Sequence, residues 1–237
     1  MLFRSDGALQ FDPETEKFTE FKSVNYKTPN GNAMTYGVAA DRHGNGWWAQ
    51  MGSDTIGKGN IATGKSEEFK LPEVAGVRAR QTPEAMKAYE HNEIGFNFPF
   101  PWQQGPRRMG TDKNGDTLWV GNSWGGSLSK IDVKTGEISI VPMADSKHEQ
   151  PYHIHVDNQH NAWGNLWNSD HIYKYDPALG RYTRFDLPRR GTEVRFISLD
   201  ETRGQLEVLI PIYRTGQMGI LTVRSEAEMA AAKRTAQ

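Results

Sequence analysis

The chain has 237 residues, enough for one domain with a substantial core. Its 28 Lys and Arg and 29 Asp and Glu give a formal net charge of −1, so we expect neither nucleic acid nor a membrane surface as a partner. The absence of cysteine excludes disulfides, thiolate metal sites and cysteine nucleophiles, and no apolar stretch approaches the roughly 18 residues of a membrane span.

The N-terminal segment shows no basic stretch followed by an apolar one, so no signal peptide is expected. The compartment stays open between periplasmic or secreted and cytoplasmic. Residues 9–15, followed by residues 17–21, match the second half of the repeated unit described next, and the first half of that unit is missing.

The repeated unit is a short strand ending in Asp, a polar turn, and a second strand opening on Trp. It occurs at residues 36–47, 107–119 and 152–163, with a weaker copy around Asp200. After each Trp, two more strands flank a turn that runs from Asp or Asn to Gly, as turn chemistry favours. Four strands in about 44 residues are typical of a propeller blade, whereas an ordinary antiparallel sandwich has no such period.

We therefore predict an all-β fold, a β-propeller of about four to five four-stranded blades over residues 1–225. An insertion at about residues 73–105 interrupts it, with a short helix at 83–92 and an extended, proline-rich loop at 97–102, either a lid or mere decoration. Residues 226–237 are expected to form a loose helical tail. The incomplete terminal units either share one blade or leave open edges that self-association protects.

The unit resembles that of the virginiamycin B lyase (streptogramin lyase) family: Pro-x-Gly-Ile-x-x-Asp-x-x-Gly-x-x-Trp, then Ile-x-x-x-Asp-x-x-Thr-Gly, then a strand closing on Leu-Pro. The matching stretches are residues 36–72, 106–142 and 151–188. The resemblance implies a seven-bladed propeller that opens a cyclic depsipeptide at its ester by elimination, with a histidine base and a divalent ion, usually Mg²⁺.

Two departures from the family pattern stand out. The family's catalytic histidines occupy the x of Pro-x-Gly-Ile, and the matching residues of this chain are Tyr36, Arg107, Tyr152 and Arg195. The family's acidic residue three places beyond the Trp of a blade is replaced by Gln50, Asn122 and Leu166.

A cluster of histidines offers other chemistry. His153 and His155 are two residues apart on a strand, so both side chains face one side, toward the channel of a propeller. With Glu149 or Glu193 they are candidate ligands of a divalent metal ion (Mg²⁺, Zn²⁺ or Mn²⁺), or one of them is a general base. The alternative is that His153 and His155 are hydrogen-bonded residues lining a polar, watery channel.

Other candidate residues surround this pair. Arg107, Arg108 and Tyr152 are candidate catalytic groups that stabilise an oxyanion or orient a substrate, unless the arginines form structural ion pairs. The tryptophans at positions 47, 119 and 163 recur at one place in the unit and are expected in the core. The remaining candidates for contact with a substrate are Tyr36, Arg195, Trp102, Trp124, Trp167 and, in the insertion, His91.

The hypothesis is a metal-assisted enzyme, a lyase or hydrolase, that cleaves an ester-like bond of a small molecule (a cyclic ester, lactone or phosphotriester) at the end of the channel. The alternative is a non-catalytic propeller that binds a ligand or a partner protein on its flat face.

Overall fold

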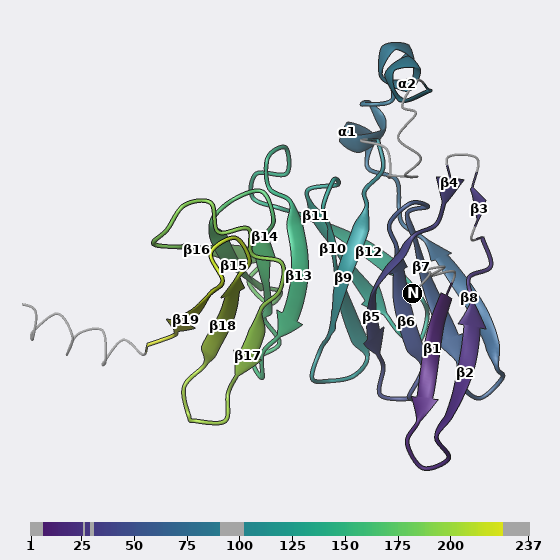
Figure 1. Ribbon diagram of the computed structural model, residues 1–237, viewed down its shortest axis with the longest axis horizontal. Coiled ribbons are helices and arrows are strands. Elements are labelled where there is room, and N and C mark those ends of the chain that lie inside the picture. Colours follow the sequence, from purple (N-terminus) through teal and green to yellow (C-terminus); the bar gives the residue numbers. More distant parts are fainter. Residues whose placement is uncertain (1–6, 26, 29–30, 91–101, 225–237) are drawn as a thin grey trace, which may run out of the picture.

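Three antiparallel sheets of four consecutive strands stand side by side in an arc (Figure 1). The computed structural model describes residues 7–25, 27–28, 31–90 and 102–224. The sheets are blade I, β5 (Thr35–Ala40), β6 (Gly46–Gln50), β7 (Thr55–Asn60) and β8 (Lys65–Lys70); blade II, β9 (Pro106–Thr111), β10 (Thr117–Asn122), β11 (Ser127–Asp132) and β12 (Ile138–Pro142); and blade III, β13 (Pro151–Val156), β14 (Ala162–Leu166), β15 (His171–Asp176) and β16 (Arg181–Asp186). The predicted four-stranded unit is confirmed.

Smaller sheets stand at the two ends of the arc (Figure 1). A pair, β1 (Gly7–Asp12) and β2 (Lys17–Lys22), precedes blade I, and a three-stranded sheet, β17 (Ser198–Asp200), β18 (Glu207–Ile212) and β19 (Gln217–Thr222), follows blade III. A short ladder joins β3 (Lys27–Thr28) to β4 (Gly31–Asn32). The expectation that the terminal pieces share one blade is wrong for the described residues, because β1–β2 and β17–β19 are separate sheets.

The Asp and Trp of the repeated unit are joined by hydrogen bonds. The carboxylate of Asp157 accepts the backbone N–H of Asn161 at 2.8 Å and the indole N–H of Trp163 at 2.7 Å. Asp41 and Trp47 repeat this arrangement at 3.0 Å in blade I. Because a buried donor needs a partner, one carboxylate fixes both the turn and the core tryptophan.

Blade II differs from its neighbours. The carboxylate of Asp112 lies 2.5 Å from Nδ1 of His160 in blade III, and the indole nitrogen of Trp119 has no hydrogen-bond partner among the described residues. Blade II therefore lacks the Asp–Trp hydrogen bond of its neighbours, and its aspartate binds a histidine of blade III instead.

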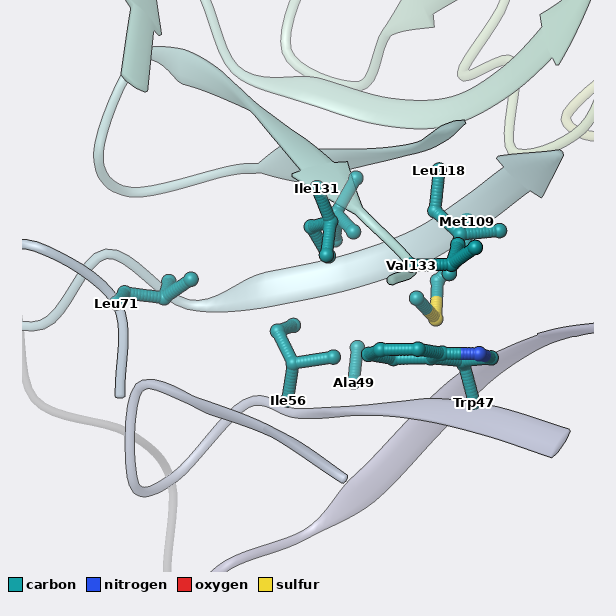
Figure 2. Packing of buried hydrophobic residues seen from close by; sticks show 9 residues of the cluster. Trp47, Ala49, Ile56, Leu71, Met109, Leu118, Ile131 and Val133 are labelled. Carbon is teal, nitrogen blue, oxygen red and sulfur yellow. The ribbon is translucent and has the colours of Figure 1, made fainter. Parts of the chain in front are cut away.

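Apolar side chains fill the space between blades, as predicted for the repeated tryptophans. Trp47 is fully buried and stacks on Phe69 at 5.5 Å between ring centroids. Figure 2 shows Trp47 and Ile56 of blade I facing Met109 and Leu118 of blade II. Burial of such large side chains removes much apolar surface from water and holds neighbouring blades together.

The insertion contains helix α1 (Ala75–Arg78) and helix α2 (Pro83–Glu90), which confirms the short helix predicted there. Both helices project above blades I and II (Figure 1). No helix among the described residues is long and apolar enough to cross a membrane. Most of the predicted 97–102 loop, His91 and the predicted tail lie outside the described residues.

Candidate functional site

The innermost strand of each blade carries a β-bulge at the same place. In blade II, Arg107 and Arg108 together oppose one residue of β10, and Tyr152 with His153 do the same against β14. Tyr36 and Gly37 form the equivalent bulge in blade I. Because a bulge re-aims the side chains that follow, the repeated bulge turns residues of three blades toward one place.

Glycine allows the inner strands of blades I and II to approach closely at the bulge. A Cβ added to Gly37 would lie 2.4 Å from the carbonyl oxygen of Arg107 and 2.6 Å from Cα of Arg108. Only a residue without a side chain fits there. The close contact places Tyr36 beside both arginines.

The guanidinium of Arg107 is surrounded by aromatic rings. Its Cζ lies 4.7 Å from the ring centroid of Trp124, 4.9 Å from that of Trp167 and 5.0 Å from that of Tyr152. Tyr36 is a fourth neighbour at 5.5 Å. Cation–π attraction therefore replaces part of the hydration that Arg107, 6% exposed, has lost.

Neither Arg107 nor Arg108 forms an ion pair in the described part of the chain. The Nε atoms of both are buried and have no hydrogen-bond partner there. Arg108 is the more exposed of the two and lies over Tyr36 and Tyr152. Buried charges are normally paired, and here the positive charge of two adjacent arginines is balanced by no described carboxylate.

The hydroxyl groups of Tyr36 and Tyr152 are hydrogen-bonded to each other at this site. Burial raises the pKa of Tyr36, but the hydrogen bond with Tyr152 and the charges of Arg107 and Arg108 outweigh it and hold the pKa below its ordinary value. Burial and Tyr36 raise the pKa of Tyr152. Tyr36, 39% exposed, is thus the accessible oxygen with enhanced acidity, and Tyr152 is the buried donor behind it.

His153 and His155 lie together, as their spacing predicts, with ring centroids 6.0 Å apart. Nδ1 of His153 accepts the backbone N–H of Ile197 at 3.3 Å, and Nδ1 of His155 accepts that of Leu199 at 3.2 Å. Burial, with the charges of His155 and Arg108, lowers the pKa of His153 to about 3. Both imidazoles are occupied in joining blade III to β17.

The structure does not bring the predicted metal ligands together. Among the described residues, no three His, Asp or Glu side chains converge on a point where an ion would bind. Glu149 accepts the backbone N–H of Asp145 at 2.9 Å instead. A neutral imidazole that accepts a bond at Nδ1 carries its proton on the other nitrogen, so His153 and His155 have no lone pair free for a metal. This donor set does not fit a divalent ion.

The remaining predicted residues lie around the arginines or apart from them. Glu193 forms ion pairs with Arg195 and Arg214, and the guanidinium of Arg195 lies 4.4 Å from the ring centroid of Tyr213. Trp102 lines a separate cavity between blade I and α1. The candidate site therefore comprises Tyr36, Arg107, Arg108, Trp124, Tyr152 and Trp167.

Sequence reasoning missed two features of this region. Phe196 stacks on His153 at 4.2 Å between ring centroids, which helps to bury the imidazole. The bulges were missed as well. They recur in the inner strands of blades I, II and III, so a comparison of these three copies is the signal that points to them, whereas nothing in the sequence marks the stacking of Phe196 on His153.

No protein-family model matches the chain, and no curated protein matches it by sequence. Its structure is similar to virginiamycin B lyase from Staphylococcus aureus (TM-score 0.63, 14% identity) over 94% of this chain and 65% of that one. The likeness to a streptogramin B lyase has a TM-score of 0.64 at 15% identity, over 94% of this chain and 63% of that one. Hydrazine synthase from Kuenenia stuttgartiensis is also similar (TM-score 0.60, 13% identity, 94% and 58% covered).

The chain thus spans about two thirds of the length of the lyases that it matches. At such identities the likeness establishes architecture and leaves chemistry open. It confirms the resemblance found in the sequence: this chain has the β-propeller fold of the streptogramin lyases.

Proposed function

We propose that the chain is an enzyme that cleaves an ester-like carbon–oxygen bond at the bulged ends of its inner strands. One observation carries this proposal. Two adjacent arginines without a described acidic partner, Arg107 buried and Arg108 half-buried, face a pair of hydrogen-bonded tyrosine hydroxyls, and one of these tyrosines, Tyr36, is accessible. Unpaired cations stabilise charge that develops on oxygen, and an acidified phenol transfers protons.

The roles of the residues follow from their positions. Tyr36 takes the proton from the carbon next to a carbonyl group, and its own acidity is set by Tyr152 and the two arginines. Arg108, half-buried and lying over both tyrosines, stabilises the negative charge that forms on the carbonyl oxygen. The electron pair then forms a carbon–carbon double bond, and the ester oxygen leaves as a carboxylate. Hydrolysis of the same ester would instead break its acyl carbon–oxygen bond, with Tyr36 activating the attacking water.

His153 and His155 take no part in these steps, because their Nδ1 atoms are already bonded to the next strand. The divalent ion implied by the family resemblance is assigned no step either, since the described donor set does not fit it. Metal dependence stays a prediction that the assay itself tests.

The test is turnover of a small panel: a streptogramin-type cyclic ester, simple lactones, aryl esters and a phosphotriester, each with and without a chelator. We expect turnover of at least one cyclic ester, and a loss of at least 100-fold in Arg108→Met. Arg181→Met, which removes an exposed arginine of β16, is the matched control. No turnover across the panel with metal supplied contradicts the proposal.

A second candidate function is supported by the enclosure of Arg107. A guanidinium held among four aromatic rings is well suited to fixed recognition of an anion and needs no chemistry afterwards. A propeller that only binds would retain an anionic ligand, in an Arg108-dependent manner, and turn over nothing.

A further inference from the structure

A polar cavity adjoins the candidate site on the side of blade III. Its volume is about 380 Å³, within the roughly 300–1,000 Å³ of small-ligand sites. Trp167 belongs to both places: its ring lines this cavity and lies 4.9 Å from Cζ of Arg107 and 5.7 Å from the ring centroid of Tyr152. A ligand that fills the cavity and extends past Trp167 therefore approaches the aromatic cage of Arg107. The cavity is lined by Gln150, Trp167, Asn168, Ser169, Asp170, Gly191, Glu193 and Arg214.

The lining combines one aromatic ring with closely spaced donors and acceptors. The hydroxyl oxygen of Ser169 is buried and has no hydrogen-bond partner among the described residues. The carboxylate of Asp170 accepts bonds from Thr192 and Gly191 and retains further acceptor capacity. Hydroxyl groups both donate and accept, so a ligand with several hydroxyls fits such a lining, and the flat C–H face of its ring packs on Trp167.

The charges around the cavity indicate the sign of the ligand. The cavity lining itself holds two carboxylates, of Asp170 and Glu193, and one guanidinium, of Arg214, and Glu193 also forms an ion pair with Arg195. With Arg107 and Arg108 the region has four arginines, so positive charge is in excess. This excess lies at the unpaired pair of arginines, where a carboxylate of the ligand finds two guanidinium groups.

We propose that this cavity and the adjoining arginines form a binding site for sugar acids: a pyranose ring packs on Trp167, and its carboxylate contacts Arg108. The proposal goes beyond the proposed function, because it concerns the ligand and requires no reaction. Its failure and the failure of the enzyme proposal therefore have different signatures.

Isothermal titration calorimetry tests the proposal with three probes: a trisaccharide of galacturonic acid, a neutral trisaccharide of glucose, and benzoate. We expect the Kd of the uronic trisaccharide to be at least tenfold lower than that of either other probe. Equal affinity for the uronic trisaccharide and benzoate would overturn the sugar subsite. Equal affinity for the uronic and neutral trisaccharides would overturn the role of the arginines.

Variants separate the two halves of the site. Ser169→Leu fills the cavity and should weaken binding of the uronic trisaccharide at least tenfold while leaving benzoate unaffected. Arg108→Met should weaken both, and Arg181→Met neither. Gln150→Leu serves as a second cavity variant in case Ser169→Leu disturbs folding, which an unfolding curve reveals. Unchanged sugar affinity in a folded cavity variant contradicts the proposal.

Together with the binding measurements, the ester panel allows each proposal to fail without the other. Sugar-acid binding without turnover of any ester supports the site and contradicts the enzyme proposal. Ester turnover without sugar-acid binding supports the enzyme and overturns the sugar site.

Discussion

The two ends of the inner strands use charge in opposite ways. At the turn end, Asp41 and Asp157 are buried, and each carboxylate accepts backbone N–H groups and an indole N–H. At the bulged end, Arg107 and Arg108 have buried Nε atoms with no hydrogen-bond partner among the described residues. The arrangement at the first end repeats in blades I and III, and the residues at the second end differ in each blade.

This contrast separates architecture from function. A paired charge that recurs is explained by the stability of the blade, because every donor around it would otherwise be unsatisfied. An unpaired charge weakens the fold unless a ligand supplies its partner. Substitutions at the two ends should therefore change different properties.

The largest effect is expected at the turn end. Asp157→Ala leaves the N–H groups of Gln159, Asn161 and Trp163 without their acceptor, so we expect the free energy of unfolding to fall by about 4 kcal/mol. Urea denaturation measures it. Asp176→Ala, which removes a carboxylate from an exposed turn, should cost about 1 kcal/mol or less. Similar losses of unfolding free energy in the two variants would show that the buried turn carboxylate has no special structural role.

Gly37→Ala tests the close approach of blades I and II. The new methyl group would meet backbone atoms of Arg107 and Arg108, so the strands must separate, at a cost of about 1–3 kcal/mol. Turnover should fall because Tyr36 moves away from the arginines. Gly46→Ala, on the same blade, is the control: a Cβ added there meets no atom within 4 Å, so it should change neither property.

Arg107→Met tests the bulged end, where we expect a loss of binding with little change in stability. Lost cation–π attraction and relieved desolvation oppose each other, so we expect the free energy of unfolding to change by only about 1 kcal/mol in either direction. Binding of an anionic ligand should be lost. A destabilisation as large as that of Asp157→Ala would show that Arg107 is structural.

The pH dependence of turnover tests the tyrosine pair. Tyr36 acts as a base only when deprotonated, and its pKa lies below the ordinary value of about 10. Turnover should therefore rise with pH through that lowered pKa, and Tyr36→Phe should lose both the rise and most of the activity. A pH profile of kcat/KM for the two proteins measures this. The same rising limb in Tyr36→Phe would assign it to another group.

The smallest effect is expected at the link between blades II and III. The hydrogen bond and charge of Asp112 raise the pKa of His160, so its stabilisation is complete below the ordinary histidine pKa of about 6.5 and is lost as pH rises through the raised value. His160→Asn keeps a residue tolerant of the positive φ at this position. The difference in unfolding midpoint between wild type and variant should shrink with rising pH, and a constant difference would rule out the ion pair as its cause.

The fold was predictable because its determinants are local and repeated. Turn residues and core tryptophans recur at similar positions in each copy of the unit, so each copy indicates the same turn and the same buried position. The common position of Tyr36, Arg107 and Tyr152 was predictable for the same reason. Strand alternation also placed His153 beside His155 correctly.

The state of the histidines was not predictable. Whether an imidazole is free depends on backbone groups far along the chain, here the N–H groups of Ile197 and Leu199. The separation of Glu149 and Glu193 from the histidines likewise depends on contacts with Asp145, Arg195 and Arg214. Neither follows from spacing.

The repeated bulge affects which residues of this protein tolerate substitution. Each bulge presents two consecutive residues, such as Arg107 and Arg108, while the strand beyond it keeps its register and its contacts with the core. Gly37 and His153 are held by contacts with the neighbouring strands, whereas Tyr36 and Arg108 are partly exposed. We therefore expect the ligand preference of this end to change through substitutions at Tyr36 or Arg108, one blade at a time, while the core beneath stays the same.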